Sequence, residues 1–295
     1  MKKTKIISMD FDGTLLTSDK KISDRTRKCL IKLKNQSYTI IGITARNLLS
    51  VKNILDVSLF DYIILNNGSD IYYVENDKIE NVNSIEKDVA KKIYDTFSEK
   101  YNQIDFCTPF NYLIKSKEKG DNRSFIKYIN GLEDVNDSVS RMNVFFENDN
   151  DLEYSRKLIE NKFENVNVFK MIDTDKANSR MWLTINPKSV NKLSTLEKIC
   201  KNLKYTINEV VFFGDGENDL VLIENVGIGV AMDNAIKVVK DKASYVTLSN
   251  DLDGIAEYLE KYLNLWDILK KVHVKNPHTR LEDCVWWPCK DTWSW

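Results

Sequence analysis

The chain has 295 residues, of which 42% are hydrophobic and 29% charged, a globular composition that excludes a disordered or fibrous chain. Its 43 basic and 44 acidic residues give a formal net charge of -1, which does not support nucleic-acid binding. No apolar run approaches the roughly 18 residues of a membrane helix, and the first one is interrupted by Asp10 and Asp12. We therefore expect a cytoplasmic protein without a membrane or nucleic-acid partner.

Histidine is scarce, which narrows the possible chemistry. The two histidines, His273 and His278, both lie near the C-terminus. A Ser-His-Asp triad, a phosphohistidine and a histidine-ligated metal are therefore excluded from the body of the chain. Cys29, Cys107 and Cys200 lie among apolar residues, as buried structural thiols do. Catalysis is left to carboxylates, hydroxyls, lysines or a bound metal.

The first 70 residues alternate between short apolar runs and amphipathic segments. The apolar runs 5–9, 38–43 and 61–65 predict three strands. The segments 23–35 and 48–55 between them predict helices. Strands and helices that alternate with short links are typical of a parallel sheet with crossover helices.

A different pattern begins near residue 71. Segments 71–74 and 79–82 flank a polar turn and predict a hairpin, and apolar residues recur every four positions over 85–97, as in an amphipathic helix. The elements predicted next are strands 104–107 and 112–115, helix 124–129, strand 142–146, helix 152–163, and strands 166–171 and 181–185. Hairpins mixed with helices indicate an α+β insert with an antiparallel sheet.

The parallel pattern resumes after Pro187. The elements predicted there are helix 193–203, strands 209–213 and 227–230, helix 235–239, strand 245–248 and helix 255–263. The expected fold is therefore α/β, with a Rossmann-like parallel-sheet core formed by residues 1–70 and 188–271. The insert spans 71–187, and a tail follows at 272–295.

Two acidic motifs directly follow predicted strands. Asp10 and Asp12 end the first strand, and Asp215 and Asp219 follow a later one. Read separately, each motif fits a polar turn or a loop that caps the next helix. A calcium loop is excluded at the first motif because its sixth position is Leu15 instead of glycine. The second motif lacks the third glycine of a dinucleotide-binding loop.

Smaller polar groups occur at equivalent places in the pattern. Thr44, Ala45 and Arg46 follow the strand 38–43, where a hydroxyl and a backbone amide suit a phosphate oxygen. Asn67 follows the next strand, and Lys192 lies near the start of the helix after the insert. Taken alone, these residues fit helix caps and a solvated lysine.

Their common location changes this interpretation. The carboxyl ends of parallel strands share one edge of a sheet, so Asp10, Asp12, Asp215 and Asp219 are expected to converge. Several carboxylates in close proximity require a compensating cation, and oxygen ligands without histidine or cysteine favour Mg²⁺. A magnesium site beside a phosphate pocket and Lys192 is what phosphoryl transfer requires.

The motifs, their order and their spacing resemble those of the haloacid dehalogenase superfamily of phosphohydrolases. The similarity is to the Cof-type (type IIB) branch, in which a large α/β cap is inserted into the core. The segment 10–14 matches the first motif, Thr44 the second, Lys192 the third and the segment 214–219 the fourth. Ala45 departs from the pattern, because this branch usually has glycine there, and the added methyl group is expected to tighten the phosphate pocket.

The resemblance implies a two-step mechanism. Asp10 attacks phosphorus and forms an aspartyl phosphate. Asp12 protonates the leaving group and then acts as base for the hydrolytic water. Thr44 and Lys192 bind the transferring phosphoryl group, and the cap, residues 71–187, closes over the site.

The resemblance also implies the remaining site residues. Asp10, the backbone carbonyl of Asp12 and Asp215 are expected to hold Mg²⁺. Asp219 and Asn218 are expected to position the metal shell and the phosphate-binding lysine. Two further residues, Arg46 and Asn67, are expected to face the cap and the substrate.

Three functional hypotheses follow. The leading one is a Mg²⁺-dependent phosphatase of a small phosphorylated metabolite, such as a sugar phosphate, pyridoxal phosphate or a flavin nucleotide. A phosphosugar mutase is an alternative, because such mutases resemble these enzymes in motifs and cap. The third is a binding protein in which the enzyme-like body is a scaffold for the C-terminal tail.

The tail at 272–295 differs in composition from the rest of the chain. His273, His278, Cys284 and Cys289 are candidate zinc ligands with looser gaps than usual finger spacing, and the two cysteines are also a candidate disulfide. Four of the six tryptophans fall in the last ten residues and would form an aromatic surface for a partner or a second copy. The simplest interpretation is a flexible or appended extension.

Overall fold

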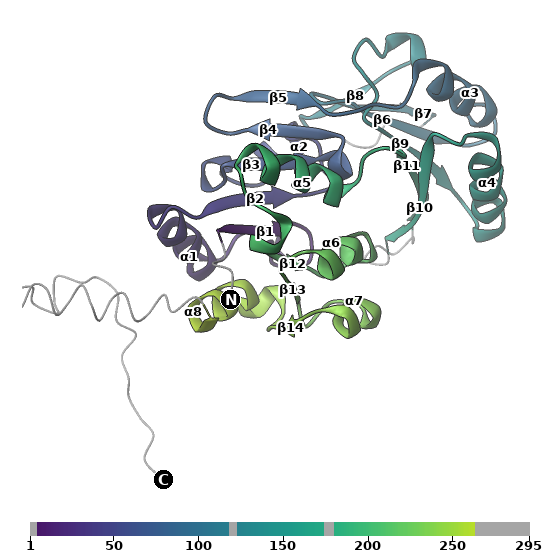
Figure 1. Ribbon diagram of the computed structural model, residues 1–295. Coiled ribbons are helices and arrows are strands. Elements are labelled where there is room, and N and C mark those ends of the chain that lie inside the picture. Colours follow the sequence, from purple (N-terminus) through teal and green to yellow (C-terminus); the bar gives the residue numbers. More distant parts are fainter. Residues whose placement is uncertain (1–4, 118–122, 174–179, 263–295) are drawn as a thin grey trace, which may run out of the picture.

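The computed structural model describes residues 5–117, 123–173 and 180–262 (Figure 1). These residues form two β-sheets, each covered by helices, that lie next to each other. None of the helices in the described ranges is long and apolar enough to span a membrane.

The predictions for the tail lie outside the described residues. They concern the candidate zinc ligands and disulfide at His273, His278, Cys284 and Cys289, and the tryptophan-rich surface.

The first sheet has eight strands in the order β14-β13-β12-β1-β2-β3-β4-β5. The strands from β14 to β3 are parallel, whereas β4 and β5 are antiparallel. Their bounds are β1 Ile6–Asp10, β2 Thr39–Ile43, β3 Tyr62–Leu65, β4 Asp70–Tyr73, β5 Lys78–Asn81, β12 Val210–Gly214, β13 Ile228–Ala231 and β14 Tyr245–Val246. The predicted α/β class with a parallel-sheet core is confirmed.

Helices cover both faces of this sheet. Leu30 and Leu259, from α1 and α8, share one core with Ile7 of β1, while Leu196 of α5 shares the other with Ile6. Both faces of the central strand are therefore buried, as in other parallel sheets. The helices on the first face are α1 Asp24–Asn35, α2 Leu48–Lys52 and α8 Gly254–Tyr262, and those on the second are α5 Lys192–Asn202, α6 Leu220–Asn225 and α7 Lys237–Lys242.

The second sheet has six strands in the order β10-β11-β9-β6-β7-β8. All its pairs are antiparallel except β7 with β8. Helices α3 and α4 pack on its side away from the first sheet (Figure 1). The bounds are α3 Lys87–Phe97, β6 Gln103–Cys107, β7 Tyr112–Ser116, β8 Ile126–Tyr128, β9 Arg141–Phe146, α4 Asp149–Lys162, β10 Val166–Asp173 and β11 Arg180–Pro187.

Two expectations about the insert were wrong. The hairpin β4–β5, expected in the insert, extends the first sheet, because Leu65 of β3 pairs with Asp70 of β4. Only a short turn separates these strands, and consecutive strands joined this way usually pair. The expected helix 124–129 instead contains strand β8, whose Ile126 pairs with Tyr112 of β7. A segment this short cannot offset the cost of helix nucleation, whereas the edge of β7 offers backbone partners.

Candidate active site

The polar motifs converge because their strands are parallel neighbours. Strands β12, β1, β2 and β3 lie side by side and run in the same direction. Asp10 is the last residue of β1, Thr44 follows β2, the turn Asn66–Gly68 follows β3, and Asp215 follows β12. The four motifs therefore meet at one edge of the sheet, where open α/β folds place their ligands.

Three carboxylates form the centre of this edge. Asp10, Asp215 and Asp219 each offer an oxygen atom, and these oxygens lie within 4.8 Å of one another. Asp10 and Asp219 are 7% and 1% exposed, and Asp215 is half-buried. The expected convergence is therefore present for three of the four acidic residues, and Asp12 is the exception.

Lys192 is the buried cation of the site. Its side chain is 2% exposed, and its Nζ lies 2.6 Å from Asp10 Oδ1 and 2.7 Å from Asp219 Oδ1. Burial acts to lower the pKa of Lys192, but the two carboxylates outweigh it and hold the pKa above its ordinary value. Taken alone, the sequence pattern predicts a solvent-exposed lysine here. In the structure Lys192 is buried and charged, and it contacts two carboxylates.

One lysine does not balance three carboxylates. Burial raises the pKa of Asp10 well above its ordinary value, and repulsion by Asp219 and Asp215 adds to this, while Lys192 opposes it. Burial also raises the pKa of Asp215 to about 6, against a hydrogen bond from Thr14. An excess of negative charge on hard oxygen ligands fits a divalent cation such as Mg²⁺.

The loops around the three carboxylates are built to hold them close. Thr14 Oγ1 donates a hydrogen bond to Asp215 Oδ1 at 2.6 Å. Gly13 has a φ of +79°, and a Cβ there would lie 2.4 Å from Asp215 Oδ2, so only glycine permits this approach. Asp219 Oδ2 accepts hydrogen bonds from the backbone N–H groups of Asp215 and Gly216. Asp219 thus orders its own loop and Lys192, and half-buried Asn218 precedes it on that loop.

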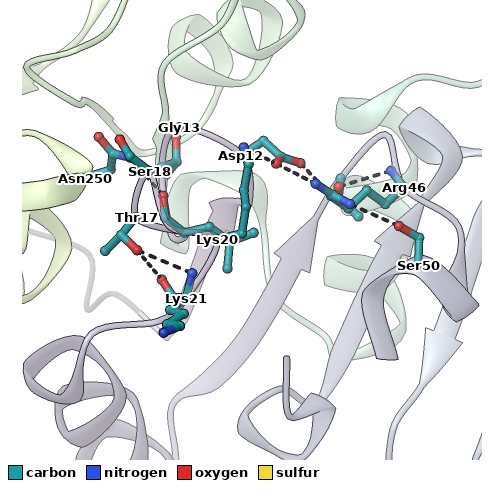
Figure 2. Close-up of polar contacts among 12 residues, drawn as sticks. Asp12, Gly13, Thr17, Ser18, Lys20, Lys21, Arg46, Ser50 and Asn250 are labelled. Carbon is teal, nitrogen blue, oxygen red and sulfur yellow. Dashed lines mark hydrogen bonds and ion pairs between the residues drawn. The ribbon is translucent and has the colours of Figure 1, made fainter. Parts of the chain in front are cut away.

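Asp12 lies outside the carboxylate cluster, which corrects the expectation of four converging acids. Figure 2 shows its carboxylate held by Arg46, with Nε–Oδ2 and Nη2–Oδ1 distances of 2.7 Å. Lys20 Nζ lies 3.1 Å from Oδ1, and Arg46 also donates to Ser50. Burial acts to raise the pKa of Asp12, but Arg46 and Lys20 outweigh it and lower the pKa. Two cations therefore stabilise the ionised form of the Asp12 carboxylate.

The second motif forms a tight loop beside these acids. Thr44 is buried, and its Oγ1 accepts a hydrogen bond from the backbone N–H of Arg46 at 3.1 Å. The N–H of Asn67 donates to the carbonyl of Thr44 at 3.1 Å, which ties the next strand end to this loop. Ala45, between Thr44 and Arg46 on this loop, is half-buried. A role for Thr44, Ala45, Arg46 or Asn67 in phosphate binding stays a prediction.

Sequence reasoning missed the residues that support the first motif from a distance. Lys20 reaches Asp12 from a loop position with a φ of +59°. Asn234 donates to the carbonyl of Gly13 at 2.7 Å, and Asn250 donates to that of Leu16 at 2.8 Å. No motif or spacing marks these residues. Lys20 is a loop lysine eight positions from Asp12, and Asn234 and Asn250 are more than 200 positions from the carbonyls that they contact.

Comparison with known proteins agrees with this geometry. The family model described as haloacid dehalogenase-like hydrolase matches residues 7–259. The 5-amino-6-(5-phospho-D-ribitylamino)uracil phosphatase YcsE of Bacillus subtilis is 27% identical over 262 residues, which are 88% of this chain and 96% of that protein.

Solved structures share the same fold. A haloacid dehalogenase-like hydrolase from Bacteroides thetaiotaomicron superposes with a TM-score of 0.76 at 28% identity, covering 88% of this chain and 99% of that one. The subclass IIB sugar phosphatase BT4131 superposes with a TM-score of 0.73 at 22% identity, covering 89% and 100%, which shows the fold alone. The resemblance that the motifs indicate is thus confirmed, and the chain belongs to the haloacid dehalogenase-like hydrolases.

Proposed function

We propose that this phosphatase hydrolyses a small phosphorylated metabolite in a Mg²⁺-dependent reaction with an aspartyl-phosphate intermediate on Asp10. The observation that supports it is the contact of the Asp10 carboxylate with buried Lys192, beside Asp215 and Asp219 at the carboxyl edge of the sheet. A nucleophile, a cation for the phosphoryl charge and a metal-ligand set are then within one site.

The first step breaks the bond between phosphorus and the alcohol oxygen of the substrate. A carboxylate oxygen of Asp10 attacks phosphorus, and the alcohol leaves with a proton supplied by Asp12. Lys192 orients Asp10 through Oδ1 and neutralises charge on the phosphoryl group. In the second step Asp12 takes a proton from water, the water oxygen attacks phosphorus, and Asp10 and inorganic phosphate are released.

The lowered pKa of Asp12 favours one of its two proposed roles, that of base, and disfavours the other, that of acid. The ionised form favoured by Arg46 and Lys20 is the base that the second step needs. As an acid in the first step, Asp12 must hold a proton, which the bidentate contact with Arg46 disfavours. We therefore expect Arg46 to leave Asp12 when substrate binds.

The three carboxylates fit a metal ion. Asp10 and Asp215 would hold Mg²⁺ together with the backbone carbonyl of Asp12, and Asp219 and Asn218 would order the surrounding loop. When bound, Mg²⁺ neutralises charge on the transferring phosphoryl oxygens.

For the substrate, the proposal is a phosphate ester of a sugar, polyol or flavin-related compound. YcsE is named for a phosphoribitylaminouracil substrate and BT4131 for sugar phosphates. The part of the segment 71–187 that follows the hairpin β4–β5 is proposed as the cap that selects among these substrates, since the hairpin itself belongs to the core sheet. A cytoplasmic location stays a prediction from the sequence.

Phosphate release from an aryl phosphate and from a panel of phosphometabolites, with and without Mg²⁺, tests the proposal. We expect metal-dependent turnover that falls about a thousandfold or more in Asp10→Asn, which lacks the nucleophile. Asp241→Asn, an exposed acid paired with Lys237 on α7, is the matched control and should retain turnover. Turnover that survives in Asp10→Asn would contradict the mechanism. Phosphate shuttling between sugar positions without net release would favour the mutase.

A further inference from the structure

The cap sheet, β6 to β11, has one apolar face and one mixed face, which carries the stacked rings of Phe145 and Trp182 at one end and polar side chains elsewhere. Side chains at alternate positions, such as Met142, Val144 and Leu183, pack under α3 and α4. The opposite face, turned away from these helices, carries the side chains of Asp105, Cys107, Arg141, Asn143, Thr184 and Asn186. These polar side chains are buried, although neither α3 nor α4 covers them.

The base of this mixed face meets the core at the turn Asn66–Gly68. Asn186 Nδ2 donates to the carbonyl of Asn66 at 3.2 Å, and Asn67 Nδ2 donates to Asn186 Oδ1 at 3.3 Å. The N–H of Asn67 in turn contacts the carbonyl of Thr44. The turn therefore joins the edge where phosphate binding is proposed to the polar side chains of the cap sheet, and the alcohol part of a phosphate ester bound at that edge would extend toward this junction.

Unpaired polar atoms gather at this junction. Across the described residues, the buried side-chain polar atoms without a hydrogen-bond partner are Asn47 Nδ2, Asn66 Oδ1, Asn67 Oδ1 and Arg141 Nε. An unpaired buried polar group costs about 1–3 kcal/mol, so such groups are rare and indicate a missing partner. Three of the four belong to the turn after β3 and to the facing end of β9.

Arg141 is the most unusual of these residues. Its side chain is 8% exposed, and the acceptor that the described residues give it is the Cys107 thiol, 3.0 Å from Nη2. Burial raises the pKa of Cys107 to about 11, so this partner is neutral. Asp105 balances the guanidinium charge from a distance, without a direct contact among the described residues. Arg141 is therefore a buried cation with an unused N–H. Because Met142 of β9 pairs with Ile185 of β11, Arg141 lies beside Asn186, the residue that contacts Asn66 and Asn67.

The two amide orientations are fixed by their neighbours. Asn66 Nδ2 donates to the Asp70 carboxylate at 2.7 Å, which can only accept. Asn186 Nδ2 donates to a carbonyl, so its Oδ1 must accept from Asn67 Nδ2. The unpaired Oδ1 atoms of Asn66 and Asn67 are therefore acceptors, while the unpaired Nε of Arg141 is a donor.

This mixture of donor and acceptors selects the chemistry of the ligand. A hydroxyl group donates one hydrogen bond and accepts others, so neighbouring hydroxyls can satisfy all three atoms. A carboxylate or second phosphate only accepts, and the two amide oxygens would repel it. An alkyl chain would satisfy none of them.

We propose that Arg141, Asn66 and Asn67 form a subsite for the hydroxyl groups of the leaving alcohol, so the enzyme selects phosphate esters of neutral polyols or open-chain sugars. These atoms are closed to solvent, so the alcohol reaches them when cap and core separate. This inference rests on the proposed phosphatase function for its catalytic tests.

The first test uses the unaltered protein with three phosphate esters of equal chain length. Ribitol 5-phosphate carries hydroxyls, pentyl phosphate carries none, and ribonate 5-phosphate keeps the inner hydroxyls but ends in a carboxylate. Hydrogen bonds of about 1 kcal/mol each predict a kcat/KM about tenfold or more higher for ribitol 5-phosphate than for pentyl phosphate. Repulsion between the carboxylate and the amide oxygens of Asn66 and Asn67 predicts a lower kcat/KM for the ribonate ester than for the ribitol ester. Equal values for the ribitol and pentyl esters, or a tenfold preference for the ribonate ester, would overturn the proposal.

The second test changes the protein. In Arg141→Met the ratio of kcat/KM for the ribitol ester over the pentyl ester should fall about tenfold. In Arg141→Lys the same ratio should lie between those of the original protein and of Arg141→Met. The control is Arg156→Met, a half-exposed arginine on α4 paired with Glu160, which should keep the ratio. An unchanged ratio in a folded Arg141→Met would refute the subsite.

A binding measurement separates the two proposals. If no phosphate ester is turned over, the proposed function fails, but calorimetry can still measure ribitol 5-phosphate binding to the original chain and to Arg141→Met. About tenfold weaker binding to the variant supports the subsite, and equal binding rejects it.

Discussion

Two aspartates two positions apart have opposite acid–base properties in this site. Burial, with the neighbouring Asp219 and Asp215, raises the pKa of Asp10, whereas Arg46 and Lys20 overcome burial and lower that of Asp12. Environments that separate the pKa values of two acids are typical of sites where the acids have different tasks. Here the difference arises because Asp10 is buried beside two other carboxylates, whereas Asp12 is held by two cations.

Lys192→Met should cost both stability and activity. The substitution leaves the carboxylates of Asp10 and Asp219 buried without their cation, which typically costs 3–5 kcal/mol. We expect a loss of about that size in the free energy of unfolding, measured with urea, and a loss of phosphate release. Lys237→Met removes an exposed lysine paired with Asp241 and should change stability by less than about 0.5 kcal/mol. Equal effects of the two variants would contradict the assigned contacts.

Asp105→Asn should remove a pH dependence of stability. Burial raises the pKa of Asp105 from 3.8 to about 6, against hydrogen bonds from Tyr112 and Gln103. Because the folded state binds this proton more tightly, the contribution of Asp105 to stability is present below about pH 4 and is lost as the pH rises through 6. Between pH 4 and 7.5 the original protein should lose about 2 kcal/mol relative to the variant. Urea unfolding at both pH values measures this, and parallel pH profiles would contradict it.

At the scale of elements, short connections between strands and helices build the site. The turn between β3 and β4 holds three successive residues with positive φ, namely Asn66, Asn67 and Gly68. This turn lets β4 reverse against β3 and also contacts α5, where Thr195 Oγ1 donates to the Gly68 carbonyl at 2.7 Å. Lys192, on the first turn of α5, is positioned by this contact.

Gly68→Ala should disturb this junction. Gly68 has a φ of +110°, and an added Cβ would lie 2.4 Å from the backbone oxygen of Asn191. Backbone strain and this clash predict a loss of about 2–4 kcal/mol in unfolding free energy, together with lower turnover because the start of α5 must shift. Gly131→Ala is the control, because its φ of -167° is extended and its neighbour is the flexible end of Glu133. Its unfolding free energy should change by less than about 0.5 kcal/mol.

At the scale of the whole molecule, the site depends on segments distant in sequence. Asp10 and Lys192 are 182 positions apart, and Thr14 and Asp215 are 201 apart. The chain leaves the first sheet after β5, forms the second sheet and returns through β11 before α5 supplies Lys192. Lys192 can therefore reach Asp10 only when the insert has folded so that β11 returns the chain to the first sheet.

Mg²⁺ should stabilise the folded chain by mass action. At a concentration 100 times its dissociation constant, a ligand specific for the folded state adds about 2.7 kcal/mol, which raises the melting temperature by several degrees. Asp215→Asn should lose most of this shift because it removes a ligand of the carboxylate cluster. Asp241→Asn should retain it. A shift that persists in Asp215→Asn after chelation and reloading would place the metal elsewhere.

Much of the fold was predictable from local patterns, because buried strands need apolar runs. The runs 5–9, 38–43 and 61–65 correspond to β1, β2 and β3. The segment 124–129 was mispredicted because a short segment adopts the structure that its neighbour β7 permits. The hairpin β4–β5 was assigned to the wrong sheet because its place depends on pairing with β3, and the pattern of apolar residues does not show which strands pair.

By itself, the sequence determined the α/β class, the interrupted core and the meeting of Asp10, Asp215 and Asp219, since parallel strands bring their carboxyl ends to one edge. Only the tertiary structure decided that Asp12 pairs with Arg46 and Lys20, that Lys192 is buried between two acids, and that Arg141 is buried with an unpaired Nε. The physical reason is that the position of a residue along the sequence sets which strand end carries its side chain. The partners, burial and protonation state of that side chain are set by distant residues that only folding brings into contact.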